Sequence, residues 1–357
     1  MDPANLIPIP DAIPVPWGIF ESLLIVTFFA HVLFVNAMLG SAFIALVREI
    51  RTPATAPPPC PDIANKLPYT IAFAVNFGVA PLLFLQVLYG HFIYSSSILM
   101  GAYWLSVIAL LILAYYSAYI YKMRHDLRTG LRRLALAFSL ALLLVITFFF
   151  VNNITLMQTP QAWDAYFARP HGTVLNLADP TLVSRYLHFL AASVALGGLF
   201  LAILAFFQGK KGDASAEKRI KSGMRWFTFA TVVEAGTGIP FLFSMPPSVH
   251  QLFVGGSALH TLVFLAAMAG TFFCVYYGAK ERLWPATHAM AATVFSMILV
   301  RDLARQAYLA PYFHPSDLPV NTQWSPFFVF LVSLVIGLGA IIYMLRLAAR
   351  VSEEGQA

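Results

Sequence analysis

The sequence contains few charged residues. Asp, Glu, Lys and Arg make up only 11% of its 357 residues, whereas 59% are hydrophobic. Soluble domains carry about 25% charged residues, so this composition excludes an ordinary soluble protein. The mean hydropathy of +0.75 favours an integral membrane protein, whose first partner is the membrane lipid.

Cysteine is also scarce. Cys60 falls in a predicted loop and Cys274 in an apolar run, which argues against a disulfide framework. No C-x-x-C-H motif occurs, so covalent haem attachment is excluded. The first residues, MDPANLIPIPDAIPVPWG, lack the basic start and the small-residue cleavage site of a signal peptide. They indicate a proline-rich mature N-terminus.

Long apolar runs fill most of the chain. A lipid-spanning helix needs about 20 such residues, and the runs predict nine helices in a single membrane domain over residues 1–357. They lie at 18–47, 68–99, 102–121, 134–156, 181–207, 225–245, 252–279, 285–309 and 325–348. The predicted fold class is therefore an all-α, polytopic membrane helix bundle.

Basic residues gather in alternate connections. The connection after the third predicted helix carries net +4, and so does the one after the fifth, whereas 157–180 and 310–324 are nearly free of basic residues. Cytoplasmic loops are typically rich in Lys and Arg, so the N-terminus is predicted outside and the C-terminus inside. The net charge of +6 thus indicates topology, and no nucleic-acid partner is expected.

An internal repeat relates the two parts of the chain. The segment HVLFVNAMLGSAFIAL begins at His31, and HFLAASVALGGLFLAI begins at His188, with His, Leu, Leu-Gly and Phe at matching positions. The motifs APLLF, ending at Phe84, and IPFLF, ending at Phe243, match at a similar offset of 157–159 residues. The chain is predicted to form two four-helix halves, about 18–156 and 181–309, and one extra helix, about 325–348.

Ionisable residues within membrane helices are costly and suggest function. His188 and His260 are predicted about 10 and 12 Å deep, at 1.5 Å per residue, so two imidazoles at matched depth can hold one metal. Haem iron suits them better than zinc, because no thiol or carboxylate accompanies them. Arg185, one turn from His188, is a candidate partner for a haem propionate. The alternative is two histidines hydrogen-bonded across helices.

Other polar residues are further candidates. His31 is the repeat counterpart of His188. By side of the membrane His91 is its best candidate partner, but an interfacial position beside Tyr89 and Tyr94 explains His91 slightly better. Arg301 and Arg305 are four residues apart and would repel each other unless an anion or Asp302 compensates; propionate binding and an internal ion pair both fit. Glu234 lies within an apolar helix without a countercharge, where a proton or quinone role and a neutral carboxyl are alternatives.

These motifs resemble subunit I of the cytochrome bd-type quinol oxidases. AHVLFVNAMLG is similar to that family's first helix and RYLHFLAASVALGGLF to its fifth, each with a haem-binding histidine. SALHTLVF falls where the family has the second ligand of the fifth-helix haem, usually methionine; here it would be His260. VRDLARQAY resembles the end of the family's eighth helix. The resemblance implies that the chain binds haem b, with two haem groups expected. It also implies a location in a bacterial cytoplasmic membrane.

The departures from this family bear on function. The family has a glutamate in helix 2 where Gln86 is the nearest residue, and another in helix 8 where Phe295 stands. Its long quinol-binding loop is shortened to MPPSVHQLFVGG. We therefore expect an electron-transfer subunit in a hetero-oligomeric complex, linking the quinone pool with a periplasmic c-type cytochrome or another redox subunit. The alternatives are a bd-like terminal oxidase and a haem-free transporter or quinone-anchor subunit.

Overall fold

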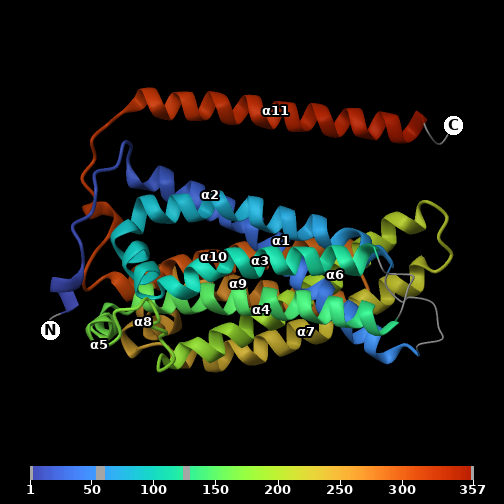
Figure 1. The fold of residues 1–357 in the computed structure, drawn as a ribbon, viewed down its shortest axis with the longest axis horizontal. Coiled ribbons are helices and arrows are strands. Elements are labelled where there is room, and N and C mark those ends of the chain that lie inside the picture. Colours follow the sequence, from blue (N-terminus) through green and yellow to red (C-terminus); the bar gives the residue numbers. More distant parts are fainter. Residues whose placement is uncertain (1–2, 54–60, 124–128, 355–357) are drawn as a thin grey trace.

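The computed structural model describes residues 3–53, 61–123 and 129–354, and within them the protein is all-α (Figure 1). The long helices are α1 (Trp17–Arg51), α2 (Pro61–Leu99), α3 (Gly101–Met123), α4 (Thr129–Gln158), α6 (Pro180–Gly209), α7 (Ala216–Ser244), α9 (Ala258–Ala279), α10 (Leu283–Leu309) and α11 (Trp324–Glu354). The short helical turns are η1 (Pro3–Leu6), η2 (Pro160–Ala162), α5 (Ala165–Ala168), α8 (Pro247–Gln251), η3 (Leu252–Gly256) and η4 (Pro315–Asp317). Among these residues, nine helices are long and apolar enough to cross a membrane, which confirms the predicted multi-pass bundle.

Local sequence signals explain several helix ends. Helix α6 begins at Pro180, which lacks an N–H group and suits a first helical position. The Asp179 carboxylate accepts a hydrogen bond from the Thr181 backbone N–H at 2.8 Å, satisfying a group that the helix leaves unpaired. Helix α2 contains Pro68 and Pro81, and helix α7 contains Pro240; Pro81 and Pro240 stand at matching places in the repeat.

The seventh membrane helix is shorter than predicted. The sequence pattern placed its start at residue 252, but the chain forms a π-type turn there and α9 begins at Ala258. Gly255 has a φ of +116°, a conformation that L side chains rarely adopt, and it interrupts the helix. The predicted start was therefore wrong. As a result, His260 lies in the first turn of α9 and not about eight residues inside it.

The two ends of the bundle differ in charge. We call the end where α1 and α6 begin the N-terminal side, on the left in Figure 1, and the other end the basic side. Lys210, Lys211 and Arg219 lie around the α6–α7 connection on the basic side. Arg219 pairs with Asp213 at 2.7 Å, and hydrogen bonds from Ser215 hold the pKa of Asp213 below its usual range.

Several predicted features lie outside the described residues. They are the loop residues Arg124, His125, Asp126 and Arg128, and also Cys60.

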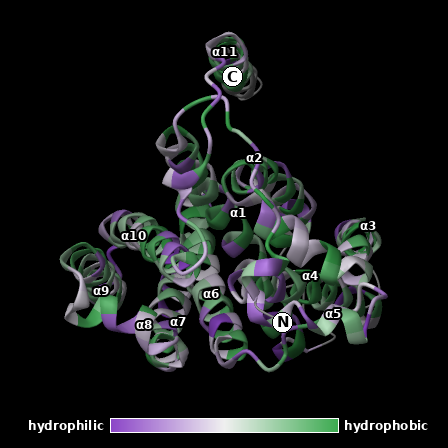
Figure 2. Cartoon of the chain, turned by 90° about the vertical axis from the view of Figure 1, so that its left-hand side faces the viewer, coloured by the Kyte–Doolittle hydropathy of each residue, from purple (hydrophilic) through white to green (hydrophobic). Residues whose placement is uncertain are grey.

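The two halves of the bundle, α1–α4 and α6–α10, meet along α1 and α6, which lie at the centre of the end view (Figure 2). Their backbones nearly touch: a Cβ added to Gly40 would come within 2.9 Å of the Gly197 Cα atom. Asn36 precedes Gly40 by four residues, and Ser193 precedes Gly197 by four. The Ser193 hydroxyl donates a hydrogen bond to the Asn36 side-chain oxygen at 2.8 Å. Positions 157 residues apart thus meet each other, as expected at a pseudo-twofold axis.

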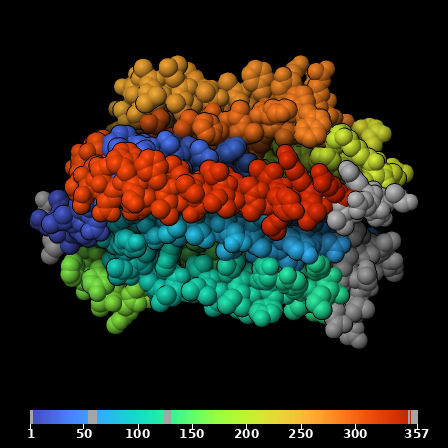
Figure 3. All heavy atoms as spheres, turned by 90° about the horizontal axis from the view of Figure 1, so that it is seen from above, coloured from blue at the N-terminus to red at the C-terminus, as the bar shows by residue number. Residues whose placement is uncertain are grey.

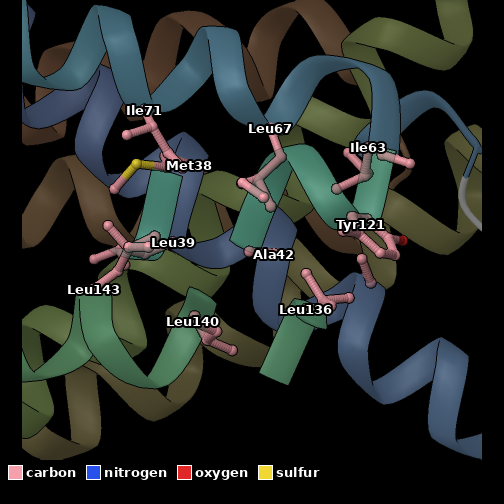
Figure 4. Packing of buried hydrophobic residues seen from close by; sticks show 14 of the residues in the cluster. Met38, Leu39, Ala42, Ile63, Leu67, Ile71, Tyr121, Leu136, Leu140 and Leu143 are labelled. Atoms are coloured by element: carbon pink, nitrogen blue, oxygen red, sulfur yellow. The ribbon is translucent and has the colours of Figure 1, made fainter. Parts of the chain in front are cut away.

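Aliphatic side chains fill the first half. Met38, Leu39 and Ala42 of α1 pack against α2 and α4 (Figure 4). Near the basic side, Arg132 of α4 forms a buried ion pair with Glu49 of α1 at 2.8 Å, and both side chains are almost fully enclosed. This end of the bundle is therefore tightly closed.

Helices α1 and α6 are much less enclosed towards the N-terminal side. In α1, none of residues 25–35 is buried, although residues 36–42 all are. In α6, none of residues 183–192 is buried, whereas 195–199 all are. We call 25–35 and 183–192 the half-covered stretches. They occupy equivalent positions before Gly40 and Gly197, so the two central helices lose cover at the same level.

Helix α11 stands apart from the bundle (Figures 1 and 2). It runs along the length of the molecule when seen from its own side (Figure 3), and no residue of its most apolar window is buried. Its connection is fixed to the N-terminal segment, since Ile13 donates a backbone hydrogen bond to Pro319 at 2.8 Å. Apolar faces of this kind are compatible with lipid contact.

The close crossing makes a testable prediction. Replacing Gly197 with Ala inserts a Cβ atom against the Gly40 backbone, and we expect it to lower the free energy of unfolding by about 1–3 kcal/mol. The matched change Gly337→Ala in α11, where a Cβ meets nothing within 4 Å, should be neutral or slightly stabilising. Thermal unfolding of both purified variants in detergent measures the difference; equal stability would contradict the crossing.

Candidate functional site

His31 lies in the half-covered stretch of α1 and faces α2. Its Nδ1 atom is 3.0 Å from the Ala74 backbone oxygen. The imidazole also lies directly against Gly78, one turn further on, where an added Cβ would be 2.8 Å from the ring carbon Cε1. A glycine at position 78 therefore makes room for the ring between α1 and α2.

His188 has the same environment in the second half. Its Nδ1 atom is 3.1 Å from the Glu234 backbone oxygen on α7, and an added Cβ at Gly238 would lie 3.3 Å from the ring. In both halves the carbonyl precedes the glycine by four residues. His31 and His188 also precede the crossing glycines, Gly40 and Gly197, by nine residues, or about 13 Å along each helix.

These hydrogen bonds determine which ring nitrogen is free. A carbonyl oxygen only accepts, so the Nδ1 atoms of His31 and His188 must donate. In the neutral imidazole Nε2 then keeps its lone pair, and no hydrogen bond to Nε2 of either residue forms within the described ranges. Metal-ligating histidines are held in the same way, by a backbone carbonyl on the second nitrogen.

Each imidazole has an aromatic neighbour and a nearby arginine. The His31 ring is 6.0 Å from that of Phe28, and the Arg301 guanidinium lies over Phe28 at 4.3 Å. The two sites are alike in this respect, although the arginine near His31 comes from α10 and the one near His188 comes from α6.

At the second site, Phe241 stands 5.9 Å from the His188 ring and 5.3 Å from the Arg185 guanidinium. Arg185 and His188 thus point to the same side of α6, as their spacing predicted. Cation–ring contacts of this kind hold the guanidinium groups in place without neutralising them.

Three arginines lie on α6 and α10 near these two histidine sites. Arg301 lies close enough to both Arg185 and Arg305 for their charges to repel. Arg305 forms a buried ion pair with Asp302, and its guanidinium also stacks over the Tyr89 ring at 4.5 Å. We call Arg185, Arg301 and Arg305 the arginine cluster. Of the two alternatives predicted for this segment, the internal ion pair is thus present, between Arg305 and Asp302.

Hydrogen bonds extend the cluster to α1. Gln306 donates to Glu21 at 2.5 Å and to Asp302 at 2.9 Å. The Nε atom of Arg185 is buried and has no hydrogen-bond partner among the described residues. Buried polar atoms are nearly always paired in folded proteins, and another nitrogen of the same guanidinium donates to the Thr181 hydroxyl at 3.4 Å.

His260 does not contact His188 in the described part of the chain. Its Nδ1 atom is 2.9 Å from the Ser257 hydroxyl, and its ring packs edge-on to Phe253 at 5.2 Å. Phe253 and Phe241 belong to one apolar cluster, so the two imidazoles border the same group of side chains. The matched depth expected of the two histidines depends on the helix start at residue 252, which was wrong.

His91 lies far from His31. The two are linked through α2, where His91 follows Ala74 by 17 residues, about 25 Å of helix. His91 is buried against Phe313 at 4.5 Å, and its Nε2 atom has no partner within the described residues. The structure therefore does not bring the predicted pair His31 and His91 together, because α2 separates them along its axis.

The remaining polar positions fall as follows. His288 is exposed near the basic side. Glu234 is buried on α7, and its backbone oxygen is the acceptor for His188. Phe295 is 40% exposed and packs edge-on to Phe29, so this position offers no carboxylate. Among the described residues, no group of three or more His, Cys, Asp or Glu side chains is placed to hold a metal ion.

Comparison with known proteins adds no family. No protein-family model matches the chain, and no curated protein matches it.

Sequence reasoning missed the residues that hold the histidines. Gly78, Gly238 and the carbonyls of Ala74 and Glu234 were not predicted. The APLLF and IPFLF motifs were a usable signal, because they begin just after these glycines. Gly78 and Gly238, which contact the two histidines, are 160 residues apart, one more than the motif offset of 159. A strict repeat alignment would therefore have paired Gly78 with Thr237.

The arginine cluster gives a second prediction. Asp302→Asn leaves the buried Arg305 guanidinium without its ion-pair partner, and we expect a loss of about 3–5 kcal/mol in unfolding free energy. Adding Arg301→Gln should recover part of this loss, because it removes a repelling charge. Thermal unfolding in detergent measures both changes.

The control is Asp213→Asn in the α6–α7 connection, whose partly exposed ion pair with Arg219 should contribute less than about 1 kcal/mol. A double variant that is no more stable than Asp302→Asn alone would show that Arg301 does not repel its neighbours.

Proposed function

We propose that this protein is a haem b-binding subunit that transfers electrons within a membrane. The observation that carries the proposal is the repeated histidine setting, in which His31 and His188 each donate Nδ1 to a backbone carbonyl and pack against a glycine. This leaves Nε2 of both residues available as an axial ligand for haem iron, which needs only one or two ligands and an apolar surrounding.

The residues around the histidines fit such a group. The half-covered stretches give surface that neither half of the bundle encloses, beside polar side chains that would be costly in contact with lipid. Phe28 and Phe241 line the two sites, and the arginine cluster supplies positive charge for acidic substituents. Bound haem would supply reversible one-electron chemistry, and the chain's residues would hold it, orient it and set its potential.

The side of the membrane follows from the charge distribution. We place the basic side in the cytoplasm, because Lys and Arg concentrate in cytoplasmic loops, with the N-terminus in the periplasm of a bacterium. His31 and His188 then lie nearer the periplasmic surface than the tightly packed crossing. This arrangement suits electron exchange between the quinone pool and a periplasmic c-type cytochrome or another redox subunit of a larger complex.

A reduced-minus-oxidised absorption spectrum of the purified protein tests the proposal. We expect a haem b α band, and we expect His31→Ala and His188→Ala each to lose one of two haems, since each removes one axial nitrogen. His288→Ala is the matched control, because His288 is exposed near the basic side, and it should leave the spectrum unchanged. A wild-type protein without haem would contradict the proposal and favour a transporter or quinone-anchor role.

His260→Ala tests the second ligand. If His260 shares iron with His188, the two variants lose the same haem; loss in only one of them contradicts the pairing. Carbon monoxide binding to the reduced protein, together with oxygen consumption, would instead indicate a terminal oxidase, because it requires an open coordination position.

A further inference from the structure

A hydrogen-bonded chain of side chains joins α1 to α10 between the N-terminal side and the His31 site. The Gln306 amide donates to the Glu21 carboxylate at 2.5 Å and to the Asp302 carboxylate at 2.9 Å. Glu21 is half-buried and follows the first residue of α1 by four positions. Asp302 is buried and lies about one turn deeper on α10 than Gln306. The chain therefore leads from a half-buried carboxylate to a buried one.

The two carboxylates share one nitrogen atom but have only one ion-pair partner. Oxygen atoms of Glu21 and Asp302 both lie within hydrogen-bond distance of the Gln306 Nε2 atom, so their negative charges repel each other. Arg305 pairs with Asp302, whereas Glu21 forms no ion pair within the described residues. Protonating one of two such neighbouring carboxylates removes the repulsion. Glu21 is thus the member of the pair that can gain and lose a proton.

Two buried polar atoms beside this chain have no partner among the described residues. They are the Nε atom of Arg305 and the hydroxyl of Tyr89. Both side chains are almost fully enclosed, and the Arg305 guanidinium lies 4.5 Å above the Tyr89 ring. Buried polar atoms of this kind commonly bind ordered water, so we expect the chain to be hydrated. Water and carboxylates in hydrogen-bond contact can pass protons to one another.

The inner end of the chain lies beside the His31 site. Arg301, the residue before Asp302, holds its guanidinium 4.3 Å from the Phe28 ring, and that ring is 6.0 Å from the His31 ring. Along α1, Glu21 precedes His31 by ten residues, or about 15 Å. At this separation and an effective dielectric constant of about 20, one charge alters the binding of another by about sixfold. A change of charge at the His31 site therefore alters proton binding at Glu21.

We propose that Glu21, linked through Gln306 to Asp302, is a proton-binding site coupled to reduction of the group held by His31. The inference rests on the proposed function. One electron from the redox partner and one proton from water on the N-terminal side are taken up together. The proton forms an O–H bond on the Glu21 carboxylate, and reoxidation releases both the electron and the proton.

Redox titration of the purified full-length protein between about pH 5 and about 9 tests the proposal. The His188→Ala background is used so that only the group at His31 titrates. Protonated Glu21 carries no charge, so the midpoint potential should be highest in acid and fall as the pH rises. We expect a total change of about sixfold in the reduction equilibrium, somewhat less than the tenfold change that corresponds to about 59 mV for one electron.

Substitutions of Glu21 identify the group that titrates. Glu21→Gln cannot ionise and should keep the potential near the acid limit of the parent protein at every pH. Glu21→Asp retains a carboxyl group and should retain the pH dependence. Glu217→Gln is the matched control, because Glu217 is 81% exposed on the basic side, and it should change neither the potential nor its pH dependence.

Other titratable or charged groups on the elements packed here have to be distinguished from Glu21. They are Arg301 and Arg305 on α10, Tyr89 and His91 on α2, His31 on α1, Arg185 on α6, His250 on α8, His260 on α9 and Asp11 before α1. Histidines titrate in the same pH range, so the reduced-minus-oxidised infrared spectrum is a second readout. A carboxylic-acid C=O band that appears on reduction and is absent from Glu21→Gln assigns the proton to Glu21.

Three results would overturn the proposal while the haem content leaves the proposed function intact. They are a potential that does not change with pH, a pH dependence that survives in Glu21→Gln, and an equal dependence in the His31→Ala background, where only the group at His188 remains. If Glu21→Gln does not fold, Glu21→Asp decides, because its C=O band should shift; an unchanged band contradicts the proposal. A wild-type protein without haem removes both the proposed function and this inference.

Discussion

The backbone contact between Gly40 and Gly197 determines the rest of the arrangement. Two helices approach this closely only where neither carries a side chain at the crossing, and the surrounding residues of α1 and α6 are buried there. The two central helices then lose cover together towards the N-terminal side. His31 and His188, each nine residues before its glycine, lie at the same level in this less enclosed region. One packing constraint thus sets the depth of both candidate sites.

The cost of polar groups in a membrane explains how these residues are held. An imidazole nitrogen in lipid needs a partner, and the backbone carbonyls of Ala74 and Glu234 supply one for each Nδ1. A helix carbonyl that also accepts a bond from an imidazole, four residues before a glycine, recurs on α2 and α7, so the solution is the same in both halves. The arginines follow different rules. Arg305 has its carboxylate in Asp302, whereas Arg301 relies on the Phe28 ring, which does not remove its charge.

Hydropathy was enough to predict the helices, because each apolar run has to cross the membrane, and the His-anchored repeat was enough to place His31 and His188 at equivalent positions. Reasoning failed where backbone conformation decided the outcome. Gly255 interrupts the seventh helix through its positive φ, which hydropathy does not register, and His260 was therefore placed too deep. The pairing of His91 with His31 failed as well. It assumed that two histidines predicted on the same side of the membrane lie close together, whereas helix α2 separates these two along its length. Gly78 and Gly238 were missed because the APLLF and IPFLF motifs just after them were used only as evidence for the repeat, and a motif does not show what the preceding glycine contacts.

At both sites a backbone carbonyl accepts a hydrogen bond from the histidine, but the charges around the two sites differ. Near His188, Arg185 interacts with Asp179 and Tyr308, so part of its charge is balanced by the chain itself. Near His31, no acidic side chain of the described residues forms an ion pair with Arg301, and it faces two other arginines. A positive surrounding favours the reduced form of a redox group, and burial and nearby charge are the protein's means of setting a haem potential. The two helical halves are therefore alike in how they hold the histidines but differ in the charge around them.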